Sequence, residues 1–293
     1  MKFRNSLLAV VMVALCAAPS SAGPQPPAGW TDGYVVANGI RIHYWRTGGN
    51  KPPLVMAHGS SDDGLCWTNL AREFQDQYDI VMFDARGHGL SDPPSPSDPP
   101  DVQVEDLAGL IKALKLSRPI LMGHSMGSSS VARFAAKYPD VARAVILEDP
   151  GLVRRATPAT GAATPTPDQR RMTILARNNT TEEELVAGCM KNSPKWGRSE
   201  CEFWAPSKRR HHPATVANVP AALPPVGELF PKITAPTLIL KADAQGDLRK
   251  QNEDVASRLP RGKIVHIEGA GHNVRRENKA QTIEVMKAFL GGT

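Results

Sequence analysis

Residues 123–127 have the sequence Gly-His-Ser-Met-Gly and lie between an apolar run, residues 120–122, and a helix-like run, residues 128–138. The two glycines lack a β-carbon, so they permit a turn too tight for larger side chains. A strand that enters a helix through such a turn leaves the Ser125 hydroxyl exposed at the carboxyl end of the strand. The N-terminus of the following helix favours negative charge there. The pattern therefore predicts an α/β fold in which Ser125 is available for chemistry.

Strand-like and helix-like runs alternate along most of the chain. Strands are predicted over residues 54–57, 80–83, 120–122, 144–147, 237–241 and 263–267, and helices over residues 67–74, 104–116, 128–138 and 278–290. Such alternation is typical of a mostly parallel sheet covered by helices on both faces. The Asn38-Gly39 pair predicts an additional hairpin near the N-terminus. No glycine-rich nucleotide loop follows the first strand, so we expect no cofactor.

Residues 151–231 interrupt the alternation. This segment is rich in Pro, Thr, Ala and Arg, and it contains two helix-like runs, residues 168–177 and 182–189, but no strand-like run. Because strand patterns resume after it, we interpret it as a lid or cap inserted after the sixth strand. The predicted core then has two parts, residues 23–150 and 232–293.

The first 22 residues have the pattern of a secretory signal peptide. Two basic residues precede an apolar stretch, residues 7–18, that is too short to span a bilayer, and small residues end at Ala22. We expect cleavage after Ala22, a secreted or periplasmic protein, and no stable membrane anchor. A lipid anchor at Cys16 is the alternative, but the large Leu15 before it is unlike a lipoprotein signal.

Three cysteines remain after such cleavage. In an oxidising compartment Cys189 and Cys201 are expected to form a disulfide that closes a short loop, which leaves Cys66 as the odd thiol. A zinc site that combines these cysteines with His211 and His212 is the alternative, although their spacing matches no recognisable ligand pattern.

The formal net charge is +6, but the basic residues are spread along the chain with acidic residues among them, so nucleic acid is not expected as a partner. The predicted lid is itself basic. Either a solvated surface or an anionic substrate explains this charge, and Trp196, Phe203 and Trp204 either line a pocket or anchor the lid. The basic residues of the lid are Arg154, Arg155, Arg170, Arg171, Arg177, Lys191, Lys195, Arg198, Lys208, Arg209 and Arg210.

Four motifs, at residues 58–59, 84–89, 123–127 and 269–272, resemble those of the α/β-hydrolase superfamily and occur in the family's order. The resemblance covers almost all of the chain outside the leader and the lid. It implies that Ser125 is a nucleophile and that His272 is its base. It also implies that the backbone N–H groups of Ser60 and Met126 form an oxyanion hole.

The acid that would orient His272 departs from the family's usual pattern. Most relatives carry it shortly after the seventh strand, where this chain has Gln245 at the expected position and Asp243 and Asp247 nearby. Relatives such as the haloalkane dehalogenases carry it after the sixth strand, which here corresponds to Asp149. Asp149 and Asp243 are the leading candidates, and Glu148 and Asp247 are further alternatives.

The resemblance implies a serine hydrolase that cleaves a small-molecule carboxylic ester or lactone through an acyl-enzyme. A serine in place of the aspartate nucleophile disfavours carbon–halogen cleavage and epoxide opening. The alternatives are a carbon–carbon bond hydrolase, a cofactor-free perhydrolase, and a binding protein of this fold without turnover. The sequence indicates no metal and no particular oligomeric state.

Overall fold

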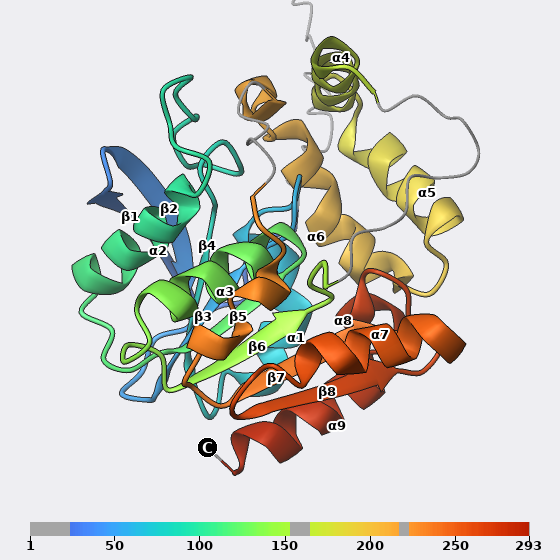
Figure 1. The fold of residues 1–293 in the computed structure, drawn as a ribbon. Helices are drawn as coiled ribbons and strands as arrows, with labels where there is room; N and C mark the ends of the chain where they lie inside the picture. The colour runs from blue at the N-terminus through green and yellow to red at the C-terminus, as the bar shows by residue number, and fades with distance from the viewer. Residues whose placement is uncertain (1–23, 153–164, 217–222, 293) are drawn as a thin grey trace, which may run out of the picture.

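An eight-stranded sheet forms the centre of the computed structural model, which describes residues 24–152, 165–216 and 223–292 (Figure 1). The strand order is β1-β2-β4-β3-β5-β6-β7-β8. Strand β2 is antiparallel to both of its neighbours, and all other neighbouring strands are parallel. The strands are β1 Thr31–Ala37, β2 Ile40–Arg46, β3 Pro53–Ala57, β4 Asp79–Phe83, β5 Ile120–His124, β6 Ala144–Glu148, β7 Thr237–Ala242 and β8 Gly262–Ile267. The predicted fold class, a mostly parallel sheet flanked by helices, is confirmed.

The predicted hairpin joins β1 and β2. Asn38 and Gly39 have φ angles of 47° and 78°, the left-handed conformation that a tight two-residue hairpin turn requires at both positions.

The central strands are buried on both faces, as expected from their continuous apolar character. Val55 and Ala57 of β3 belong to one hydrophobic core, and the alternating Leu54 and Met56 belong to the other. Helices α2, α3 and α7 contribute to the first core, and helices α1, α8 and α9 to the second. These helices are α1 Thr68–Phe74, α2 Val102–Ala113, α3 Met126–Lys137, α7 Gly246–Ala256, α8 Val274–Glu277 and α9 Lys279–Leu290.

The described part of the insertion is helical. Helices α4 Pro167–Asn178 and α5 Glu182–Asn192 match the two predicted runs, whereas α6 Gly197–Arg209 was not predicted. Helix α6 packs against α4 and α5 and against the 3-10 helix Gly64–Trp67, and Figure 1 shows the three helices as a group above the sheet. The insertion boundaries at residues 151 and 231 stay a prediction.

The disulfide predicted between Cys189 and Cys201 is present and joins α5 to α6. Cys66 is a free, buried thiol. Burial raises its pKa to about 12, so the thiol stays protonated at neutral pH.

A buried ion network fastens α6 to the core. Lys208 of α6 lies 2.6 Å from the Asp62 carboxylate, and Arg276 of α8 lies 3.0 Å from Asp62 and 3.2 Å from Glu200 of α6. Burial disfavours charge on Asp62, but Arg276 and Lys208 hold its pKa well below its usual range. The network therefore consists of charged groups, and removal of one of them would lower the free energy of unfolding by leaving a buried charge without its partner.

Several predictions fall on residues outside the described ranges. They concern the signal peptide with its cleavage after Ala22, the lipid anchor at Cys16, and the charges of Arg154 and Arg155. Among the described helices, none combines the length and apolar character needed to cross a bilayer.

Candidate active site

Ser125 occupies the turn between β5 and α3. Its φ and ψ angles are 51° and −108°, a conformation that non-glycine residues rarely adopt. The flanking glycines permit the turn: a β-carbon on Gly123 would lie 2.3 Å from the Gly127 carbonyl oxygen, and one on Gly127 would lie 2.1 Å from the Ala57 carbonyl oxygen. The chain thus holds Ser125 in a strained turn at the carboxyl end of β5.

The structure brings Ser125, His272 and Asp149 into one hydrogen-bonded row. His272 Nε2 lies 2.9 Å from Ser125 Oγ, and His272 Nδ1 lies 2.5 Å from Asp149 Oδ2. The serine follows β5, the aspartate follows β6 and the histidine lies in the loop after β8, so three strand ends meet at one edge. A carboxylate at Nδ1 places the imidazole proton there and leaves Nε2 free to accept the serine proton.

Asp149 is buried and remains ionised. Burial opposes its charge, but the hydrogen bond from His272 and the charge of Lys241 lower its pKa to about 2. The Lys241 ammonium contacts Asp149 Oδ1 and donates to the Pro150 carbonyl oxygen at 3.0 Å, and the Ala242 N–H donates to Oδ1 at 3.2 Å. The sequence does not point to Lys241, because a lysine at the end of a strand is commonly a solvent-exposed residue and its contact with Asp149 depends on the fold.

The three other acid candidates have different partners. The Asp243 carboxylate accepts from the Gly269 N–H at 2.9 Å, and Glu148 accepts from the Arg275 backbone and guanidinium, each at 2.9 Å. Asp247 lies exposed in the first turn of α7. Of the four carboxylates, Asp149 is the one that accepts a hydrogen bond from His272. Asp243 supports the loop that carries the histidine.

His124 also supports the His272 loop. Burial lowers its pKa to about 4, so the imidazole is neutral, and its Nε2–H donates to the His272 carbonyl oxygen at 3.0 Å. The Gly271 N–H donates to the Glu277 carboxylate at 2.6 Å. The histidine backbone is thus held from two sides, which limits the freedom of its ring.

Ser60 and Met126, the predicted oxyanion-hole residues, line one cavity of about 720 Å³. The loop that carries Ser60 is held by α6, because Lys208 Nζ donates to the Ser61 carbonyl oxygen at 2.6 Å. Gly59 is required in this loop, since a β-carbon there would lie 2.5 Å from His124 Nδ1. Helix α4 and two histidines that stack on each other, His88 and His211, form another part of the cavity wall.

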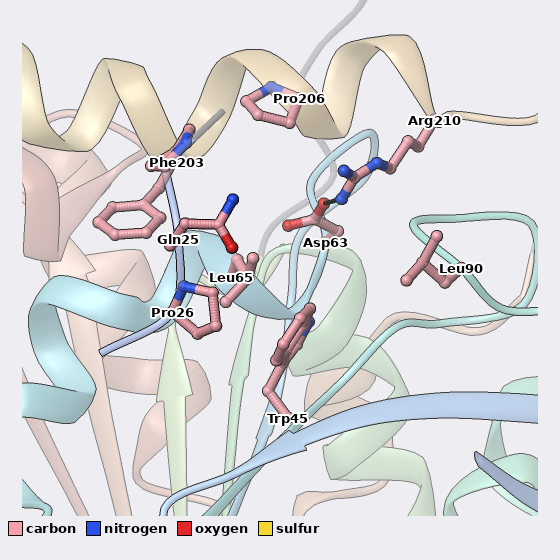
Figure 2. A pocket seen from close by; sticks show the side chains of 10 residues that line it. Gln25, Pro26, Trp45, Asp63, Leu65, Leu90, Phe203, Pro206 and Arg210 are labelled. Atoms are coloured by element: carbon pink, nitrogen blue, oxygen red, sulfur yellow. Dashed lines mark ion pairs between the residues drawn. The ribbon is translucent and has the colours of Figure 1, made fainter. Parts of the chain in front are cut away.

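A second cavity, of about 140 Å³, lies beside α6 (Figure 2). Its wall contains Trp45 of β2 and Phe203 of α6. Asp63 and Arg210 face one another in Figure 2, and the Arg210 guanidinium lies 4.0 Å from the Asp63 carboxylate. Unlike the larger cavity, it contains neither of the predicted oxyanion-hole residues. Among the described residues, no three His, Cys, Asp or Glu side chains gather as a metal site.

The chain matches the model of a known protein family and is similar in sequence to several characterised proteins. The model of the alpha/beta hydrolase family matches residues 54–285. Epoxide hydrolase 1 of Caenorhabditis elegans is 24% identical over 91% of this chain and 72% of its own length. The 2-(acetamidomethylene)succinate hydrolase of Mesorhizobium japonicum is 36% identical, but the match covers 36% of this chain and 37% of that protein.

Among solved structures, the N-formylmaleamic acid deformylase of Pseudomonas putida S16 superposes with a TM-score of 0.70. The alignment covers 87% of this chain and 100% of that one at 24% identity, which establishes a shared fold.

Proposed function

Because this chain belongs to the alpha/beta hydrolase family, we propose that it is a serine hydrolase that cleaves a carboxylic ester or lactone through an acyl-enzyme on Ser125. The observation that carries the proposal is the row of hydrogen bonds from Ser125 Oγ through His272 to Asp149. A serine hydroxyl is a weak nucleophile at neutral pH, and an imidazole in contact with it removes that limitation.

The first half of the reaction forms the acyl-enzyme. His272 Nε2 takes the hydroxyl proton while Ser125 Oγ attacks the carbonyl carbon, and the ionised Asp149 stabilises the resulting imidazolium. His272 then gives the proton to the leaving alkoxide, which departs as an alcohol. In a lactone the alcohol stays attached to the acyl group.

The tetrahedral intermediate carries negative charge on the former carbonyl oxygen. In the proposed mechanism the backbone N–H groups of Met126 and Ser60 donate to this oxygen, and each donor contributes about 3–4 kcal/mol. Water activated by His272 then attacks the acyl group, and Ser125 leaves with its proton restored.

Two features of the chain bear on the alternatives. The epoxide hydrolase among the relatives matches at 24% identity, but the residue at the turn here is Ser125 and not an aspartate. A serine hydroxyl has no carboxylate oxygen with which to form an alkyl-enzyme ester, so epoxide opening by that route is disfavoured. A carbon–carbon bond hydrolase or a perhydrolase would use the same row of residues. Assays with a diketone and with peroxide separate these activities from ester hydrolysis.

We also propose that the protein is secreted or periplasmic, and that residues 1–22 are removed on export. The proposal is supported by the leader pattern and by the Cys189–Cys201 disulfide, since disulfides persist in oxidising compartments. N-terminal sequencing of the protein recovered outside the cytoplasm should begin at Gly23, and a product that retains Met1 would contradict export.

Ester hydrolysis is tested with 4-nitrophenyl butyrate. We expect turnover by the wild type and a loss of about 10³-fold or more in Ser125→Ala, with an unchanged melting temperature. Equal turnover by both proteins would contradict the proposed mechanism.

A further inference from the structure

The larger cavity has walls of two kinds. One wall belongs to the core and includes Ser60 and Met126, the residue that directly follows Ser125 in the chain. The opposite part of the lining comes from α4 and from the 3-10 helix Pro213–Val216. A substrate whose carbonyl lies at Ser125 therefore extends towards α4, and the residues of α4 contact the part of the substrate that does not react.

Helix α4 presents one face to this cavity. The four residues of α4 in the lining are Arg170, Thr173, Ile174 and Arg177, which follow the i, i+3, i+4, i+7 spacing of a single helical face. Ile174 is buried and Arg170 is half-buried, whereas Thr173 and Arg177 are exposed. Arg171 is also exposed, but it lies outside the lining.

The two arginines on this face have no countercharge within the described residues. Neither guanidinium forms an ion pair or a side-chain hydrogen bond there, and the Nε atom of Arg170 is shielded from solvent without an acceptor. Arg86 of the same lining differs, because it pairs with Asp98 at 2.5 Å and with Asp106 at 2.6 Å. The positive charge of Arg86 is thus neutralised by the protein itself.

The rest of the lining supplies no countercharge either. The described lining contains no Asp or Glu. Burial lowers the pKa of His211 to about 4, so this histidine adds no positive charge, and Arg170 and Arg177 are the unneutralised cations of the wall. Apolar side chains such as Val102 and Val216 line the remainder.

We propose that the cavity binds substrates that carry a carboxylate, which Arg170 and Arg177 hold at the α4 wall while the ester or lactone carbonyl lies at Ser125. This inference rests on the proposed ester hydrolysis. The Arg170 guanidinium is half-buried and its shielded Nε lacks an acceptor, so it gains a charge-assisted hydrogen bond from a carboxylate. The exposed Arg177 adds a second positive charge on the same face of α4. The apolar lining accommodates the carbon chain between the two ends.

Two substrates that differ in one charge test the proposal. Mono(4-nitrophenyl) adipate carries a free carboxylate, and its methyl ester has the same leaving group and acyl chain without the charge. We expect the wild type to favour the acid by about tenfold or more in kcat/KM, the scale of one charge-assisted hydrogen bond. In Arg170→Gln/Arg177→Gln this preference should fall to about one, through loss of activity on the acid alone.

Arg171→Gln is the matched control, because it removes one charge from the same helix outside the cavity. It should keep the wild-type preference, and activity on the methyl ester reports that each variant is folded. An equal effect of the double substitution on both substrates would overturn the proposal, as would a wild type without preference.

A binding measurement tests the carboxylate site even if the proposed hydrolysis is wrong. If the wild type hydrolyses neither ester, calorimetry with adipate decides: binding that is lost in the double variant and kept in Arg171→Gln supports the carboxylate site, whereas absent or unaffected binding overturns it.

Discussion

The edge of the sheet around Ser125 and the cavity face of α4 differ in how their charges are satisfied. At the sheet edge the charged side chains pair with one another: His272 contacts Asp149, Asp149 contacts Lys241, and Glu148 contacts Arg275. On the α4 face, Arg170 and Arg177 have none among the described residues. The proposed catalytic residues are thus held in place by the fold itself, whereas we propose that a ligand supplies the countercharge of the α4 face.

Two helices of the insertion, α6 and α4, differ in whether their charged side chains pair with the core. Helix α6 is joined to the core through Lys208 and Asp62, and the same lysine donates to the carbonyl beside Ser60. Buried charged contacts therefore join α6 to the core, whereas the arginines on the cavity face of α4 make no such contacts among the described residues. Each of the following predictions alters the sheet edge or its junction with α6 and leaves the cavity face of α4 intact.

The largest effect is expected from the acid at the sheet edge. Asp149→Asn should lower kcat for 4-nitrophenyl butyrate by about 10³-fold or more, because the imidazolium loses its stabilising charge. Asp243→Asn is the matched control and should cost less than about tenfold, since Asp243 bonds to the Gly269 N–H and not to the imidazole. The reverse ranking would show that the acid lies after the seventh strand.

The ion network beneath α6 should contribute to stability. Lys208→Met leaves the buried Asp62 with fewer partners, and we expect a loss of about 3 kcal/mol in the free energy of unfolding. Arg209→Met removes an exposed neighbour that lies 3.7 Å from Glu182, and it should cost less than about 1 kcal/mol. Urea unfolding measures both values, and similar costs would contradict a special role for the buried pair.

Asp63, at the junction of the core and α6, should make stability depend on pH. Burial and the neighbouring Asp84 raise its pKa to about 7, above the ordinary value of 3.8. The stability that its protonated form contributes is present below pH 3.8 and is lost as the pH rises to about 7.

Asp63→Asn removes this loss. From pH 4 to pH 8 the variant should gain about 4 kcal/mol in unfolding free energy relative to the wild type, because each unit of pKa shift corresponds to about 1.4 kcal/mol. A difference in unfolding free energy that stays constant over this range would contradict the raised pKa.

The smallest effect is expected at Lys241, which we regard as a positioning residue for Asp149. Lys241→Met should lower kcat by about tenfold with little change in KM, because Asp149 keeps its bond to His272 but loses the ammonium at Oδ1. Lys263→Met on the neighbouring strand β8 is the control and should leave kcat unchanged. Recovery of activity in Lys241→Arg would support positioning by charge.

The core of the fold was predictable because apolar strands and the Asn38-Gly39 turn are local signals. Helix α6 was not predicted: its buried face includes Lys208 and Glu200, which look like solvent-facing residues until the partner elements are known. Helix α7 was missed because few of its residues are buried, so its sequence lacks a strong apolar stripe.

The position of His272 after the last strand was predictable from motif order. The choice between Asp149 and Asp243 was not, because it depends on which strand end approaches the imidazole in space. The same holds for Arg170 and Arg177, whose spacing indicates a shared helical face but not that the face meets a cavity.

The most direct test of the proposed mechanism is covalent labelling of the protein with a fluorophosphonate, followed by mass spectrometry of the peptides. We expect one adduct, on Ser125, which forms rapidly in the wild type and about 10²-fold or more slowly in His272→Ala. An unlabelled Ser125, or a rate of labelling that does not depend on His272, would contradict the claim that this histidine activates the serine.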